Sequence, residues 1–271
     1  MIPPNTLLYI YEIRGDPGDY LSDPPASFIG LWNEEGFSYL FFTKPEDEYI
    51  NRQVCDRGLA LGSRHEVQYG DWQTVLPPHG IKVAGVCFVG PNHPSPPPEA
   101  LLLDPSVVFG DGSHPTTNCC LGFMEEIIRA ELITSMLDLG TGSGILALAA
   151  ARMGVKRVLA VDRNRLAVQT AMDNVKVNAL DSVIRVQEGE ARLFIDQPFD
   201  LVTANLPFHV LRELIPLKGA ALHRFWIVSG INEQQGETLK ELFSDLGYET
   251  CRHSVDPPWV TFTTAKRCSI E

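Results

Sequence analysis

The second half of the chain alternates short apolar runs with longer segments in which apolar residues recur at helical spacing. Strands are predicted at residues 136–139, 158–162, 182–187, 199–204 and 224–228. Helices are predicted directly after residue 144, at 115–129, at 165–178 and at 233–246. Residues 248–254 and 260–265 predict a closing antiparallel hairpin. This order predicts a doubly wound α/β sheet that binds ligands at the carboxyl ends of its strands.

The first third of the chain has a different pattern. Short strands are predicted at 7–13, 28–32, 38–42 and 83–89, the last with Gly85 as a bulge, and a helix at 45–59. The proline-rich segment 90–98 sustains neither helix nor sheet and is expected to be a linker. We therefore expect a small α+β domain over residues 1–95 and a larger domain over residues 96–271.

A glycine-rich loop joins the strand 136–139 to the helix that follows. Gly140, Gly142 and Gly144 stand at alternate positions, where they permit a tight turn with φ > 0 and expose backbone amides at a helix N-terminus. The next strand ends on Asp162, and a carboxylate there suits the two hydroxyls of a ribose. The pattern predicts a site for a nucleoside-bearing cofactor. A glycine-rich turn without a ligand is the alternative.

Composition narrows the functional classes. The net charge of −12 opposes a nucleic-acid substrate held through its phosphates and suits a basic protein partner. The six cysteines show no C-x-x-C spacing, so we expect no metal site. No apolar run approaches the ~20 residues of a membrane span, and the first residues lack a signal-peptide pattern. We expect a cytoplasmic protein.

Further candidate site residues follow the later strands. Glu190 can reach an adenine, although an ordinary surface acid is equally compatible with its position. Asn205, followed by Leu206, Pro207 and Phe208, ends the strand 199–204. The Asn205 oxygen can accept the hydrogens of an amine and aim its lone pair at a methyl donor, while Phe208 packs against the acceptor. A proline-containing turn from strand to helix is the structural alternative.

Three other polar residues are weaker candidates. His114 and His209 are each compatible with a general base, but also with ordinary hydrogen-bonding or exposed positions. Thr117 lies at the start of the helix 115–129, where its hydroxyl can bind a cofactor carboxylate or simply be buried. None of the three is a certain general base.

The spacing G-x-G-x-G, with Asp138 two residues ahead, resembles the class I S-adenosylmethionine (SAM) methyltransferases and their seven-stranded, Rossmann-like sheet. The loop Phe109–Thr117, together with the glycine loop and Asn205, is similar to the signature of the bacterial ribosomal protein L11 methyltransferases. This resemblance covers residues 72–266. It implies Thr117, Gly140, Asp162 and Asn205 as SAM-binding positions. Together with Asp138, Gly142 and Glu190, which the loop pattern and the strand ends indicate, these residues form the predicted cofactor set.

The resemblance also implies a function. That family methylates lysine and N-terminal amines of its ribosomal substrate, and its small N-terminal domain recognises that substrate. We therefore predict a SAM-dependent protein N-methyltransferase, with Asn205, Leu206, Pro207 and Phe208 as its catalytic segment. The Asn-Leu-Pro-Phe sequence is also similar to motifs of enzymes that methylate adenine amines or glutamine amides. An amino-methyltransferase of another protein or of RNA, and a non-catalytic SAM-binding module, remain the alternatives.

Overall fold

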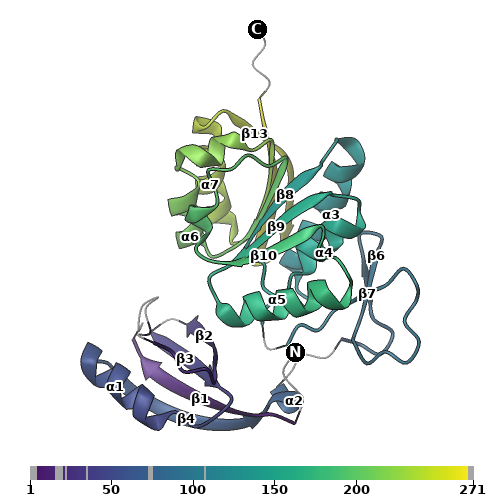
Figure 1. Ribbon diagram of the computed structural model, residues 1–271. Coiled ribbons are helices and arrows are strands. Elements are labelled where there is room, and N and C mark those ends of the chain that lie inside the picture. Colours follow the sequence, from purple (N-terminus) through teal and green to yellow (C-terminus); the bar gives the residue numbers. More distant parts are fainter. Residues whose placement is uncertain are drawn as a thin grey trace.

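The computed structural model describes residues 5–15, 21, 23–34, 36–72, 76–106 and 108–267. Its largest element is a seven-stranded sheet with the order β10-β9-β8-β11-β12-β14-β13 (Figure 1). All neighbouring strands are parallel except at β14, which is antiparallel to both β12 and β13. The strands are β8 (Ser135–Leu139), β9 (Arg157–Asp162), β10 (Ile184–Glu188), β11 (Leu201–Asn205), β12 (Phe225–Ile231), β13 (Tyr248–Asp256) and β14 (Trp259–Lys266). The predicted doubly wound α/β fold is confirmed.

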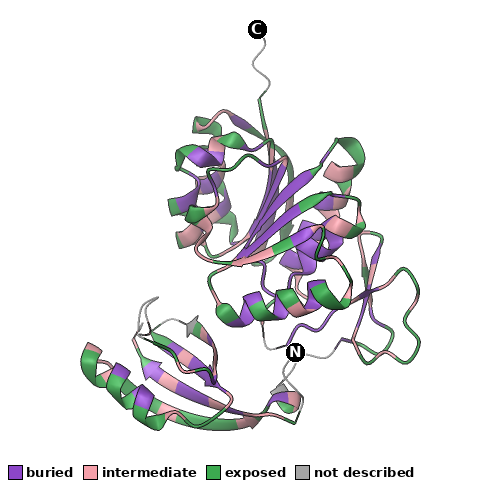
Figure 2. Ribbon diagram, in the orientation of Figure 1, coloured by how far each residue is buried: buried purple, intermediate pink, exposed green. Residues whose placement is uncertain are grey.

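Helices cover both faces of this sheet. One face packs against α3 (Pro115–Ala130), α4 (Ile145–Arg152) and part of α5 (Arg165–Val177), and the other against α6 (Phe208–Leu214) and α7 (Glu233–Asp245). Met136 of β8 points into the first core, whereas Leu137 and Leu139 point into the second, as the alternation of a strand requires. Because both faces are covered, the central strands are buried along their length (Figure 2).

The chain order defines where a ligand can bind. From β8 the chain winds through β9 and β10 to one edge and then returns to β11 on the other side of β8. The carboxyl ends of β8 and β11 therefore flank the switch point, where ligands bind in open α/β sheets. The 3₁₀ turn η1 (Ala191–Leu193) follows β10, and the 3₁₀ turn η2 (Lys218–Leu222) precedes β12.

A second, four-stranded sheet has the order β2-β3-β1-β4 and forms the smaller N-terminal domain. Its elements are β1 (Leu7–Arg14), β2 (Phe28–Glu34), β3 (Phe37–Phe42), α1 (Asp47–Arg57), β4 (Ala60–Gln68) and the short α2 (Tyr69–Trp72). The helix α1 covers one face of the sheet, through Tyr49 and Ile50. The opposite face packs Ile10 and Phe41 against Leu166 of α5. The expected small α+β domain is thus present.

A third, three-stranded sheet joins the two parts. It consists of β5 (Ile81–Val83), β6 (Val86–Val89) and β7 (Leu101–Leu102). The prediction of one strand at 83–89 with a bulge at Gly85 was wrong. Ala84 and Gly85 both have positive φ, 49° and 72°, and form the two-residue turn of a β5–β6 hairpin.

The proline-rich segment 90–98 connects β6 to its parallel neighbour β7. Phe88 and Leu101 lie in the same core cluster as Met136 of the large sheet. The domain boundary at residue 95 stays a prediction. Among the described residues, none of the helices is both long and apolar enough to cross a membrane.

Candidate functional site

The glycine loop turns sharply between β8 and α4. Gly140, Gly142 and Gly144 have φ values of 73°, 57° and 85°, which favour glycine over any residue with a side chain. A Cβ at Gly140 would lie 2.3 Å from Cδ2 of Leu206, and one at Gly142 would lie 2.4 Å from the carbonyl oxygen of Phe109. Glycine is therefore required by conformation and by space, and the loop is held closely by its neighbours.

Asp138 supports this loop from inside the protein. It is only 1% exposed, and its two oxygens accept hydrogen bonds from Oγ1 of Thr141 and Oγ1 of Thr203, each at 2.6 Å. Burial raises the pKa of the Asp138 carboxyl to about 6. The structure thus gives Asp138 a loop-ordering position between β8 and β11. Its direct contact with a cofactor stays a prediction.

Asp162 faces the glycine loop from the end of β9. Its Oδ2 accepts the backbone N–H of Gly142 at 3.0 Å, and its Oδ1 accepts the backbone N–H of Asn164 at 2.9 Å. Burial raises the pKa of this carboxyl above its ordinary value. A carboxylate oxygen accepts more than one hydrogen bond, so Asp162 retains capacity for two ribose hydroxyls.

Glu190 lies at the same edge of the sheet, just after β10. Its Oε2 forms an ion pair with Nε of Arg192 at 2.6 Å, and both side chains are partly exposed. An exposed pair of this kind contributes about 0–1 kcal/mol. Glu190 is therefore able to exchange Arg192 for a ligand at little cost.

Asn205 ends β11 and is anchored by α3. Its Nδ2 donates to Oγ1 of Thr116 at 3.0 Å, and that oxygen lies 2.7 Å from Nδ1 of His114. Within the described part of the chain, no hydrogen bond reaches Oδ1 of Asn205. The side chain is thus fixed by its nitrogen, while its oxygen remains an acceptor for an incoming donor.

The residues after Asn205 divide into two roles. Leu206 covers Gly140, whereas Pro207 caps α6 and Phe208 begins that helix, packed partly against its core cluster. The segment is thus both the strand-to-helix turn and a wall of the glycine loop. Both the structural and the catalytic interpretation of these four residues are compatible with this arrangement, so their catalytic assignment stays a prediction.

The two candidate histidines differ in their surroundings. His114 is the N-cap of α3, where Nδ1 accepts the backbone N–H of Thr116 at 3.3 Å. Its ring packs edge-on between Phe109 and Trp259, with centroid distances of 5.1 and 5.3 Å. His209 is exposed on α6. The structure gives His114 a capping and packing position, which accounts for its presence without a role as a base.

Sequence reasoning missed an aromatic group around His114, which is linked to Asn205 through Thr116. Phe109 is 51% exposed, and Trp259 begins β14 next to His114. Trp259 lies 150 residues after Phe109, so no local pattern indicated their proximity through His114. The sequence did contain one indication of a packed aromatic residue here. Trp259 follows Pro257 and Pro258 in a hairpin turn, where a large apolar side chain would be exposed to water unless it packed against another part of the protein.

The hydroxyl of Thr117 is one of five buried polar side-chain atoms without a hydrogen-bond partner among the described residues, and it lies one residue after Thr116, which binds Asn205. Thr117 is 1% exposed, and among the described residues its Oγ1 has no hydrogen-bond partner. A buried hydroxyl left unpaired costs about 1–3 kcal/mol, so a partner is expected. The unpaired Thr117 hydroxyl and the remaining acceptor capacity of Asp162 fit a cofactor with a carboxylate and a ribose. The backbone N–H groups of Gly140 to Gly144 are already bonded within the protein, so the expected exposure of amides at this loop is not observed. No cluster of His, Cys, Asp and Glu suited to a metal ion occurs in the described ranges.

Comparisons with known proteins match most of the chain to proteins described as ribosomal protein L11 methyltransferases or methylases. The family model described as ribosomal protein L11 methyltransferase (PrmA) matches residues 55–267. A ribosomal protein L11 methyltransferase of Desulforamulus reducens is 31% identical over 230 residues, which cover 80% of this chain and 74% of the relative. The protein of that name from Staphylococcus aureus is 29% identical over 95% of this chain and 84% of its own length. The crystal structure of a ribosomal protein L11 methylase from Lactobacillus delbrueckii has a TM-score of 0.59 and 27% identity, and the match covers 67% of this chain and 95% of that one.

Proposed function

The chain belongs to the ribosomal protein L11 methyltransferase family, and we propose that it transfers methyl groups from SAM to amines of ribosomal protein L11. The observation that carries the chemistry is the placement of Asn205. Its amide nitrogen is held by Thr116, and its oxygen accepts no hydrogen bond from the described residues, at the carboxyl end of β11. The next residue, Leu206, lies against Gly140 of the glycine loop. The proposed substrate places the reaction in the cytoplasm, where ribosomal proteins are made.

The cofactor set follows from the site described above. Gly140 and Gly142 would line the methionine and ribose parts, Asp162 the ribose hydroxyls and Glu190 the surroundings of the adenine. The Thr117 hydroxyl would bind the SAM carboxylate and so gain the partner that it lacks. When bound, SAM supplies a methyl group on a positively charged sulfur. The protein's own contribution is chiefly positioning.

The acceptor amine must be neutral to attack, whereas a lysine amine has a reference pKa of about 10.4. Oδ1 of Asn205 can accept a hydrogen of the neutral amine and orient its lone pair. Phe109 and Trp259 provide apolar surface that excludes water, and aromatic faces favour the cationic product. These groups favour transfer without a dedicated general base.

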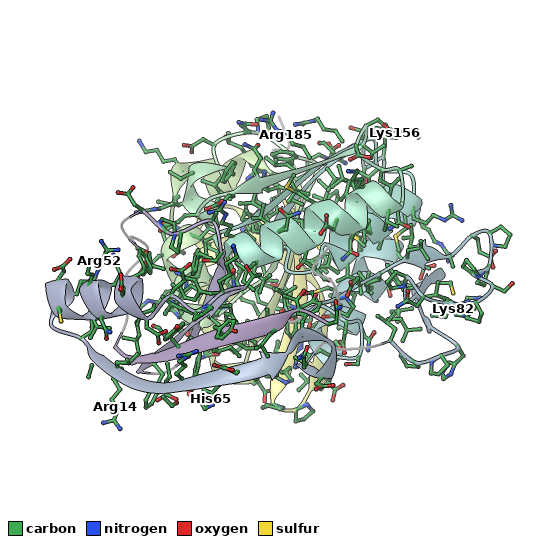
Figure 3. The ribbon with its side chains drawn as sticks, turned by 60° about the horizontal axis from the view of Figure 1, so that its bottom comes forward. Arg14, Arg52, His65, Lys82, Lys156 and Arg185 are labelled. Carbon is green, nitrogen blue, oxygen red and sulfur yellow. The ribbon has the colours of Figure 1, made fainter. Side chains whose placement is uncertain are left out.

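The charge distribution supports a protein acceptor. Figure 3 shows that the labelled basic side chains Arg14, Arg52, His65, Lys82, Lys156 and Arg185 lie apart on the molecule, with Lys156 and Arg185 on the side away from the first domain. These six do not form a single track for a phosphate backbone. Together with the net charge of −12, this favours a basic protein, and we propose the first domain as its recognition surface.

Transfer of labelled methyl from SAM tests the proposal. Purified enzyme is incubated with L11, with other ribosomal proteins and with ribosomal RNA. We expect label on amines of L11, nearly none with Asn205→Ala, and an unchanged rate with the matched control Arg212→Ala, which alters an exposed residue of nearby α6. Label on RNA alone, or on no acceptor despite SAM binding, would support the alternative readings instead.

A further inference from the structure

One residue links the cofactor edge of the large sheet to the first domain. Asn164 follows Asp162 by two positions, and its backbone N–H donates to Oδ1 of Asp162 at 2.9 Å. Its side-chain Oδ1 accepts the N–H of Leu166 at 2.9 Å and so caps α5. Its Nδ2 donates to the carbonyl oxygen of Leu31 in β2 at 2.8 Å. A side chain of the catalytic half thus holds the edge strand of the first domain.

These bonds form a continuous path. The N–H of Gly142 donates to Oδ2 of Asp162, Asp162 binds Asn164, and Asn164 binds Leu31. Four groups therefore connect the glycine loop to the first domain through hydrogen bonds of 2.8–3.0 Å. Asp162 holds the backbone N–H of Asn164, whereas the side chain of Asn164 binds Leu31 through Nδ2 and Leu166 through Oδ1. The backbone and side chain of one residue thus lie between Asp162 and β2.

The backbone of β2 packs closely against the first turn of α5. An ideal Cβ on Gly30 would lie 2.5 Å from Cβ of Leu166 and 2.9 Å from Oδ1 of Asn164. Gly30 is buried and has no positive φ, so its lack of a side chain is required by the approach of α5 and not by the backbone conformation. Figure 1 places β2 beside one end of α5, in agreement with the contacts.

A second anchor lies further along the interface. Tyr69 is buried, and its hydroxyl donates to Oγ of Ser106 at 2.5 Å. Ser106 belongs to the segment that leads from β7 toward the site, so this anchor does not depend on Asn164. The first domain is thus held at two separate places, by Asn164 at β2 and by Ser106 at Tyr69.

We propose that Asn164 is a positioning residue that couples cofactor binding to docking of the first domain on α5. Cofactor binding at Asp162 stabilises the Asn164–Leu31 contact, and the docked domain in turn holds Asp162 in its binding position. Linkage requires both effects to have the same magnitude. The proposal rests on the proposed function, because it takes Asp162 as the ribose-binding carboxylate.

Two variants separate docking from the cofactor site. Asn164→Ser retains a hydroxyl that caps α5 but cannot reach Leu31. Gly30→Val alters no residue of the cofactor loop or of α5, while its side chain would collide with Leu166 and with Oδ1 of Asn164 and so separate β2 from the start of α5. Gly90→Val is the matched control, because nothing lies within 4 Å of a Cβ at Gly90 and its φ is not positive.

The probe is S-adenosylhomocysteine, with its affinity measured by calorimetry and the amide exchange of residues 28–34 measured by mass spectrometry. In the unaltered protein and in Gly90→Val, the probe is expected to slow exchange in this segment. Both interface variants are expected to bind the probe about threefold to tenfold more weakly and to lose its effect on exchange. Unchanged exchange in β1 confirms that the first domain remains folded.

The outcomes are distinct. Unchanged affinity in both variants, with faster exchange of residues 28–34, would overturn the coupling because the domain would be undocked without consequence. Unaltered exchange in both variants would overturn it as well, since the contacts would then not hold the domain. Failure of the unaltered protein to bind the probe would instead overturn the proposed function, and with it the premise of the coupling.

Discussion

Replacing Asp138 by asparagine is expected to remove a pH-dependent cost from the folded protein. The carboxyl is buried between β8 and β11, and its pKa is raised from 3.8 to about 6 because burial disfavours the charge. Asparagine has nearly the same shape. Its oxygen can accept from one of the two threonine hydroxyls, at Thr141 or Thr203, and its nitrogen can donate to the other after that hydroxyl rotates.

The size of the stability cost follows from how far the pKa of Asp138 is raised. The folded state holds this proton more tightly than the unfolded state, so the free energy of unfolding falls as pH rises from about 4 to 6. One pKa unit corresponds to about 1.4 kcal/mol, so the full cost above pH 6 is about 3 kcal/mol. At pH 5 about half of that cost is present, which leaves a difference of about 1.4 kcal/mol between pH 5 and pH 7.5.

Urea unfolding of both proteins at pH 5 and pH 7.5 measures this difference. The stability of Asp138→Asn relative to the unaltered protein is expected to improve by about 1.4 kcal/mol between the two pH values. Other titrating groups occur in both proteins and cancel in the comparison. A relative stability that is the same at both pH values would show that Asp138 is not held near this pKa, and the reasoning from its burial would be wrong.

Three further substitutions test the site. Asp162→Ala is expected to weaken binding of S-adenosylhomocysteine by at least tenfold, because a charge-assisted bond to the ribose is worth about 1.5–3 kcal/mol; unchanged affinity by calorimetry would exclude the ribose assignment. Asn205→Ala should lower turnover more than cofactor affinity, and equal losses would make it a cofactor-holding residue. Thr117→Val should stabilise the free protein by about 1 kcal/mol in thermal unfolding, since it removes an unpaired buried hydroxyl, yet weaken cofactor binding. A loss of stability in this variant would mean that the hydroxyl has a partner within the protein.

Much of the larger domain could be predicted from the sequence because its central strands are buried on both faces. β8, β9 and β11 are mostly apolar and buried, and at the ligand-binding edge they lead to Gly140, Asp162 and Asn205. The observed bounds differ from the predicted ones by only a few residues. Local sequence was sufficient there because the same residues that form the strand also form the core.

The first domain was harder to predict, for a physical reason. β4 was missed because it is an edge strand with mostly exposed residues, such as Arg64 and Glu66, so its sequence lacks an apolar face. Gly85 was misassigned because a glycine within an apolar run is compatible with both a bulge and a turn. The positive φ of Ala84, an unusual conformation for alanine, could not be read from the sequence.

The candidate site residues were named from the sequence one at a time, without the contacts that the structure shows between them. The Asn205–Thr116 bond joins residues 89 positions apart, and the Asn164–Leu31 bond joins residues 133 positions apart. Such pairings depend on how α3 and the first domain pack against the sheet. Trp259 was missed for the same reason, since the sequence placed it only in a hairpin turn.

The most direct measurement is the mass of ribosomal protein L11 after incubation with the enzyme and SAM, followed by mapping of the modified residues. If the enzyme acts as proposed, L11 gains one or more methyl groups at lysine or N-terminal amines, and Asn205→Ala produces almost none. An unchanged mass of L11, with methyl groups appearing on RNA or on another protein under the same conditions, would contradict the proposed substrate.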